Sequence, residues 1–183
     1  MIFTQTKLKG AYIIDIEKLE DDRGFFARTW CEDQFAAHDI DMRISQGSVS
    51  FSPKQGTLRG LHYQDQPCEE AKLIRCTRGE VFCVLIDLRA DSNTYTQHIT
   101  INLTQDNHRS VFVPPMVANG FQTLLNDSEV SYQMSEKFNP KYMRGVRWND
   151  PLFAIQWPLE VSSILARDNQ FPDFSPDGDR TTG

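Results

Sequence analysis

The chain has 183 residues, of which 39% are apolar and 24% charged, enough for one globular domain with a sizeable core. Its net charge of -6 argues against a general nucleic-acid binder, although a few local arginines could still hold a phosphorylated small molecule. No apolar run approaches the roughly 18 residues that cross a bilayer, and no secretion signal is recognisable. The four cysteines form no CxxC pair, which favours reduced thiols over a zinc ribbon. We therefore expect a cytoplasmic protein with no membrane partner.

In chain order, short strands between turn signals dominate the sequence. An apolar run at 11–16 predicts the first strand, and the segment 30–40, where Phe35 follows Cys31 at helical spacing, predicts the one clear helix. Further strands are expected at 72–76, 81–90, 98–103, 110–115 and 129–138, with turns at 77–80 and 105–110. Many short strands favour a sandwich or barrel, of which a double-sheet jelly roll is one form. The chain shows no repeat or linker, so we expect a single domain over 1–183 with a frayed polar tail at about 175–183.

The stretch GTLRGLHYQ places one histidine, His62, in a strand-like run beside Arg59, Tyr63 and Gln64. The residues alone leave two interpretations open, a packed core histidine and a proton-transfer base. A metal site is disfavoured, because metal-binding cupins need several histidines and a carboxylate in close array. Strict alternation would put Arg59 and His62 on opposite faces of a strand, so both can face inward only if Gly60 marks a bulge. The other histidines lie at a helix end, on a polar strand face and in a turn, and need no function: His38, His98 and His108.

Seven stretches, taken together and in order, carry a resemblance that covers almost the whole chain. They are DDRGFFARTW, GTLRGLHYQ, AKLIRCTRGEVFCVLIDLR, VFVPPMVANGFQTL, EVSYQ, RGVRWNDPLFAIQWP and ILARDNQFPDF. The chain resembles the dTDP-4-dehydrorhamnose 3,5-epimerase family of nucleotide-sugar enzymes. That resemblance implies an all-β, cupin-type double-sheet jelly-roll barrel with a few short peripheral helices, no metal and no cofactor. It also implies a homodimer formed through N-terminal strands.

The chemistry of such an epimerase explains which side chains it needs. A ketone at C4 makes the protons on C3 and C5 acidic, so the enzyme needs a base, a group that stabilises the enolate, and an acid on the opposite face of the ring. The resemblance implies that His62 is the base, Asp168 its carboxylate partner, Lys72 the cation beside the enolate oxygen and Tyr132 the acid. Taken alone, Lys72 could extend from a strand end, Tyr132 could be a core residue and Asp168 a cap; the resemblance favours function.

The resemblance also implies the residues that hold the nucleotide. Arg23 and Arg59 match arginines that bind the diphosphate, a task suited to a fork of donors, and Arg23 is expected to reach into the partner subunit's site. Gln46 matches a pocket glutamine, and Phe138 lies where an aromatic ring stacks on the thymine.

Five positions depart from the pattern of the better-known family members. Arg28 replaces a glutamate, Cys83 an aspartate, Asn119 a histidine, and Gly47 and Ser48 replace polar residues. Arg28 and Asn119 remain candidate substrate-binding residues. We therefore expect an epimerase that inverts C3, with or without C5, of a nucleotide-linked 4-keto-6-deoxy sugar. The alternatives are a nucleotide-sugar 3,4-ketoisomerase and a non-catalytic cupin that binds sugar nucleotides.

Overall fold

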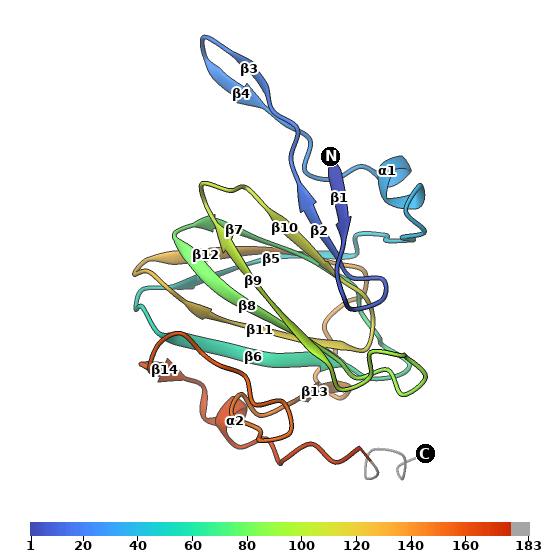
Figure 1. Cartoon of the computed structure of the whole chain (residues 1–183), viewed down its shortest axis with the longest axis vertical. Helices are drawn as coiled ribbons and strands as arrows, with labels where there is room; N and C mark the ends of the chain where they lie inside the picture. The colour runs from blue at the N-terminus through green and yellow to red at the C-terminus, as the bar shows by residue number, and fades with distance from the viewer. Residues whose placement is uncertain (177–183) are drawn as a thin grey trace.

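Two facing β-sheets form the body of the protein (Figure 1), in a computed structural model that describes residues 1–176. The first sheet has the order β1-β2-β10-β7-β12-β5, and the second has the order β13-β6-β11-β8-β9, with β14 beside β6. The predicted cupin-type jelly roll is confirmed. Most of the predicted tail at 175–183 lies outside the described residues.

The first sheet comprises β1 (Ile2–Gln5), β2 (Tyr12–Asp15), β5 (Gln46–Ser52), β7 (Lys72–Arg78), β10 (Ser110–Val113) and β12 (Ser128–Met134). The second comprises β6 (Thr57–Gln64), β8 (Glu80–Asp87), β9 (His98–Thr104), β11 (Val117–Thr123), β13 (Met143–Gly145) and β14 (Ser163–Ile164).

The predicted helix is shorter than its sequence pattern. It spans only α1 (Glu32–Ala36), without a side-chain cap at Cys31. The chain then turns back to the sheet through Asp39, which has a φ of 59°, and Ile40 is buried although it lies outside the helix. The predicted helix was too long because Ile40, an apolar residue after α1, is buried by a loop that returns to the sheet and not by a further helical turn. A second short helix, α2 (Ala166–Asn169), lies near the C-terminal end.

Three apolar clusters hold the layers together. The central one lies between the two sheets and includes Val81, Cys83 and Leu85, which alternate along β8 as a half-buried strand requires. A second covers the outer face of the second sheet with the segment that contains Phe153 and Trp157. The third packs α1 and the N-terminal strands on the first sheet. Each sheet is therefore covered at least in part on both of its faces.

A bulge in β6 decides how the central histidine strand presents its side chains. Against β11, Asn119 pairs with His62 and Phe121 pairs with Arg59, so the register shifts between these pairs. Gly60 there has a φ of 115°, and a Cβ atom on it would lie 2.6 Å from the Cα of Gly120. Only glycine fits that backbone and that contact. The bulge required for Arg59 and His62 to face the same side is thus present.

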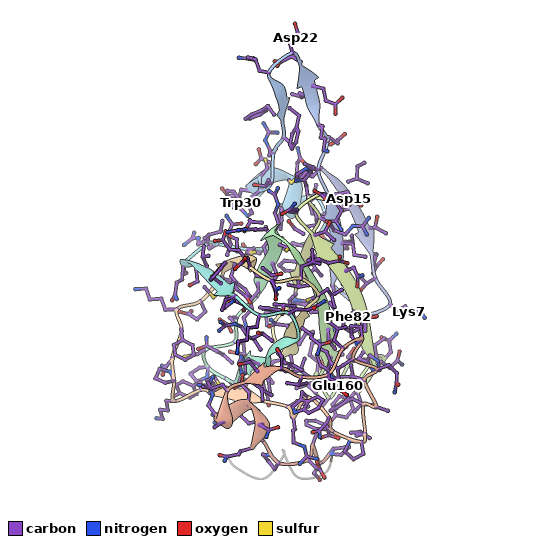
Figure 2. The ribbon with its side chains drawn as sticks, turned by 90° about the vertical axis from the view of Figure 1, so that its left-hand side faces the viewer. Lys7, Asp15, Asp22, Trp30, Phe82 and Glu160 are labelled. Carbon is purple, nitrogen blue, oxygen red and sulfur yellow. The ribbon has the colours of Figure 1, made fainter. Side chains whose placement is uncertain are left out.

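A two-stranded hairpin, β3 (Leu19–Asp21) and β4 (Gly24–Phe26), forms a separate sheet. It extends away from the body, and Asp22 lies at its tip (Figures 1 and 2). The chain thus carries a projecting arm that none of its own sheets covers. No helix among residues 1–176 is long and apolar enough to cross a membrane.

Candidate active site

Two adjoining cavities open between the sheets, with volumes of about 460 and 260 Å³. Four side chains line both: Arg59, His62, Tyr132 and Arg167. The larger cavity extends toward β14 and α2, and the smaller extends toward β5, β7 and β11. Their combined size suits a ligand of two linked parts, such as a sugar joined to a nucleotide.

His62 and Asp168 form a hydrogen-bonded pair at the junction of the cavities. Nε2 of His62 lies 2.8 Å from Oδ1 of Asp168, although the two residues are 106 positions apart in sequence. A carboxylate only accepts hydrogen bonds, so Nε2 carries the proton and Nδ1 is left with a lone pair. The pair therefore has the arrangement of an oriented base and its carboxylate partner.

Asp168 is held in its charged form by three donors. Its side chain is buried, and burial by itself would raise the pKa of the carboxyl group. The hydrogen bond from His62, the positive charge of this imidazole when it is protonated, the backbone N–H of Gly60 and the guanidinium of Arg167 outweigh burial, so the pKa of Asp168 is lowered. The bulge contributes here as well, because it directs the Gly60 N–H to Oδ2 at 3.3 Å.

Lys72 and Tyr132 reach the cavities from the opposite sheet. Lys72 begins β7, and Tyr132 lies in β12, where its register partners are Ile74 and Ser48. His62 lies in β6 of the second sheet. Lys72 and Tyr132 therefore face His62 across the space between the sheets, and a flat ligand there would have a base on one side and a phenol on the other.

The phenol of Tyr132 stays protonated over the whole range of physiological pH. Burial raises its pKa, the nearby Cys83 raises it further, and the charge of Arg59 opposes both. Cys83 itself is uncharged, since burial raises the pKa of its thiol to about 12. A neutral phenol is the form that can donate a proton.

Three further residues that were predicted to bind substrate also line the cavities: Arg59, Gln46 and Phe138. Arg59 donates to Ser52 and to the Phe51 carbonyl, and has no carboxylate partner among the described residues. Gln46 accepts a hydrogen bond from the backbone N–H of Phe138 at 3.1 Å, and both line the smaller cavity. Phe138 is 51% exposed, so one face of its ring is free for stacking.

Two predicted substrate-binding residues lie outside both cavities of this chain. Arg23 lies in the turn of the β3–β4 hairpin, where its exposed guanidinium pairs with Asp21 at 2.6 Å. This contact lowers the pKa of Asp21. Arg28 is exposed just after β4. Neither lines a cavity with His62.

Asn119, which was also predicted to bind substrate, does line the smaller cavity, and its Oδ1 accepts a hydrogen bond from Lys72 at 2.9 Å.

Two further residues line the cavities although the sequence analysis did not identify them as site residues. Arg167 precedes Asp168 directly and lines both cavities. Glu70 lies 2.8 Å from the Lys72 ammonium; its position two residues before Lys72, on the same face of an extended chain, was the available signal. Within residues 1–176, no three His, Cys, Asp or Glu side chains are grouped as metal ligands would be.

Comparison with known proteins agrees with this geometry. A family profile described as dTDP-4-dehydrorhamnose 3,5-epimerase matches residues 5–176. An enzyme of that name from Methanothermobacter thermautotrophicus is 40% identical over 174 residues, spanning 95% of this chain and 93% of the relative. The crystal structure of such an enzyme from Bacillus anthracis, with TDP and PPi bound, has a TM-score of 0.91 and 34% identity, covering 94% of this chain and 99% of that one.

A structure with a narrower activity is also similar. It is a 3'-monoepimerase from Streptomyces bikiniensis in complex with dTDP-quinovose, with a TM-score of 0.84, 27% identity, and coverage of 91% of this chain and 85% of that one. Fold, facing residues and family profile lead to one conclusion. The chain is an isomerase that belongs to the dTDP-4-dehydrorhamnose 3,5-epimerase family, whose members epimerise nucleotide-linked keto-deoxy sugars.

Proposed function

We propose that this protein inverts C3 of a dTDP-linked 4-keto-6-deoxy sugar, and inverts C5 more slowly or not at all. The observation that carries the reaction type is the His62–Asp168 pair, with its 2.8 Å hydrogen bond, facing Tyr132 across a cavity. That arrangement provides a base on one side of a sugar ring and an acid on the other, as epimerisation next to a ketone requires.

Each step uses an atom of this site. Nδ1 of His62 takes the C3 proton, and the electron pair moves into the C3–C4 bond while the C4 oxygen becomes an enolate. An N–H of Lys72 donates to that oxygen and stabilises its charge. The O–H of Tyr132 then protonates C3 from the other face. Solvent returns a proton to Tyr132 and removes one from His62, so the site regains its starting state.

The nucleotide half of the substrate fits the exposed side of the cavities. Arg59 has no carboxylate partner among the described residues and lies beside Arg167 on the lining of both cavities. Two guanidinium groups suit a diphosphate, because each offers paired donors to phosphate oxygens. The half-exposed ring of Phe138 offers a surface for the base.

The preference for C3 follows from the altered polar residues. Inversion at both carbons requires one base to reach protons on both sides of the ketone, so the ring must bind in two poses. Cys83 is buried and neutral here, and Asn119 is engaged by Lys72. Ser48 lines the smaller cavity as a short side chain. Fewer groups are left to hold the second pose, and a similar structure belongs to a 3'-monoepimerase.

Deuterium exchange tests the reaction and the preference together. The protein is incubated with dTDP-4-keto-6-deoxyglucose in deuterium oxide, and NMR follows label at C3 and C5. Label should appear at C3 well before C5, with inversion at C3. His62→Asn should lower exchange at both carbons by about a hundredfold or more, because no enolate forms. Tyr132→Phe should lower net inversion by about a hundredfold or more and should affect exchange less. Proton transfer between C3 and C4 would identify a ketoisomerase, and saturable binding without exchange would identify a binding protein.

We also propose that the protein is a homodimer in which Arg23 completes the partner subunit's site. The β3–β4 hairpin is a two-stranded sheet, which is marginal in water by itself. It nevertheless exposes Leu19, Phe25 and Phe26, the last by 70%. Val49 and Phe51 on the edge strand β5, near the cavity, are exposed as well. A second copy that covers both apolar surfaces would bring an arm with Arg23 near the cavity residues of β5.

Subunit mixing tests this arrangement. A mixed dimer of Arg23→Ala and His62→Asn should regain one working site, because the chain that keeps His62 receives Arg23 from the other. A mixed dimer of His62→Asn and Tyr132→Phe is the control, since both residues belong to the same chain's cavity, and it should stay inactive. Mixed Arg23→Ala and His62→Asn dimers without activity would disprove a shared site.

A cytoplasmic location is part of the same proposal. All four cysteines are free, as expected in a reducing compartment. Fractionation with antibodies against the protein checks this, and recovery from an oxidising compartment would contradict it.

A further inference from the structure

The ammonium group of Lys72 lies between two acceptors of the same site. Nζ is 2.8 Å from Oε1 of Glu70 and 2.9 Å from Oδ1 of Asn119. Lys72 and Glu70 are each 8% exposed and Asn119 is 6% exposed, and all three line the smaller cavity. Glu70 is a buried carboxylate that the proposed reaction does not use.

Counting donors shows what this arrangement leaves for a ligand. An ammonium group has three N–H donors in fixed tetrahedral directions and no acceptor. Glu70 and Asn119 occupy two of them. Fixing two directions fixes the third, so a single N–H of Lys72 is left with a defined direction for a ligand oxygen. A lysine on a flexible four-carbon stem would otherwise sample several positions.

A buried amide, Gln64, lies behind Glu70. Its Oε2 is 3.4 Å from Nε2 of Gln64, a long hydrogen bond. Gln64 is fully buried, and the same Nε2 also donates to the carbonyls of Cys68 and Lys137. The two N–H groups of this amide have closer acceptors in those carbonyls, so Lys72 is the main partner of the Glu70 carboxylate, which lies between the end of β6 and the start of β7.

We propose that Glu70 is a positioning residue of the epimerase site: together with Asn119 it orients the Lys72 ammonium so that one N–H meets the oxygen on which the enolate charge develops. The inference rests on the proposed function and deepens it. Glu70 also balances the charge of Lys72 in the buried site. Because two N–H groups of Lys72 are already engaged, the third points in its direction before the enolate forms. Such preorganised donors lower the barrier more than mobile ones.

The expected signature is a loss in rate with little loss in binding. In Glu70→Gln, the charged acceptor is gone while the volume is retained, and the ammonium is free to rotate. A misplacement of about 1 Å costs on the order of a hundredfold in rate, so C3 deuterium exchange should fall by roughly ten- to a hundredfold. The KM should change by less than about threefold, because the nucleotide anchors Arg59 and Arg167 are unaffected. Glu69→Gln is the matched control, since the ion pair and hydrogen bond of Lys72 are with Glu70 and Asn119 and not with this neighbouring glutamate, so exchange should be unchanged.

A double-mutant cycle separates positioning from a general structural role. If Glu70 acts through Lys72, adding Glu70→Gln to Lys72→Met should cause no further loss of exchange. It should also raise the melting temperature above that of Lys72→Met, in which Glu70 is left buried without its partner. An additive loss of exchange in the double variant would overturn the proposal.

A chemical measurement tests the placement of Lys72 without relying on turnover. Reductive dimethylation with mass spectrometry gives the modification rate at each lysine of the full-length protein. Lys72 should react severalfold faster in Glu70→Gln, because its amine is no longer held by a carboxylate, while the exposed Lys54 should react at the same rate in both proteins. Equal rates at Lys72 would overturn the proposal. If the wild-type protein exchanged no deuterium, the proposed function would fail, and the labelling rates would still decide the role of Glu70.

Discussion

Replacing Asp168 with asparagine changes one atom of the site and tests the reasoning most directly. Three donors converge on this carboxylate: His62 and Arg167 on Oδ1, and Gly60 on Oδ2. An amide has only one oxygen, so one of its two orientations must be chosen. With the oxygen toward His62, the amide N–H₂ group would face the buried N–H of Gly60, which cannot move. With the oxygen toward Gly60, the N–H₂ group faces His62 and Arg167.

The second orientation is favoured, because the Arg167 side chain is 47% exposed and can turn into solvent. His62 must then accept at Nε2 and carry its proton on Nδ1, the atom that should act as base. The variant also loses the negative charge that stabilises a protonated imidazole. The same change of tautomer in a serine protease triad lowers kcat by about 10⁴. We expect C3 exchange to fall by roughly 10³ to 10⁴ in Asp168→Asn.

The assay is the rate of deuterium incorporation at C3, measured per folded molecule after circular dichroism has established the melting temperature. Asp87→Asn is the control: this carboxylate is also buried and also hydrogen-bonded, to Arg89, Ser92 and Thr94, but lines neither cavity. It should lose stability without losing exchange. A folded Asp168→Asn protein that exchanges within about tenfold of wild type would refute the tautomer argument.

Three further predictions follow from the same structure. Gly60→Ala should lower the free energy of unfolding by roughly 2 to 4 kcal/mol and remove exchange, because the φ of Gly60 is 115° and the new Cβ would lie 2.6 Å from the Cα of Gly120. Denaturant titration measures this loss. Gly47→Ala is the control and should be nearly neutral, since its Cβ would meet nothing closer than 3.8 Å. The lowered pKa of Asp168 means that its contribution to the free energy of unfolding is complete above about pH 4 and is lost as pH falls through the folded value; wild type and Asp168→Asn should therefore converge in stability in acid, and a constant difference down to pH 2 would contradict this. Exhaustive chelation should leave turnover unchanged, whereas activity lost with a stoichiometric metal and restored by it would show that a metal is required.

Sequence reasoning identified the strands, and it selected His62, Lys72 and Tyr132, which line the cavities, because both leave local or motif-level signals. The strands at 72–76, 81–90 and 98–103 alternate in polarity or run apolar between turns, and they appear as β7, β8 and β9. The order of the matching motifs along the chain indicated the family from the sequence alone. The helix at 30–40 was overestimated, because Ile40 is buried by tertiary packing and not by a helical turn.

The arm and the charge network needed the folded structure. The short strands β3 and β4 bear no apolar alternation that a chain could bury against itself. Only the structure shows that the hairpin projects from the body (Figure 1) and that its phenylalanines are exposed. Glu70 belongs to no motif, and its spacing from Lys72 indicates only a shared face of the chain; the 2.8 Å contact that supports its proposed role is seen only in the folded structure.

The sequence by itself determined which side chains are available for the proposed proton transfer: a histidine, a carboxylate, a lysine and a tyrosine in family motifs. Only the tertiary structure decided how they meet. Asp168 reaches His62 across 106 residues because α2 packs near β6, and Arg59 and His62 share a cavity because Gly60 inserts a bulge. Strand periodicity is a local property of the chain, whereas a bulge and a contact between distant segments depend on the approach of two backbones, which here is possible because Gly60 and Gly120 have no Cβ.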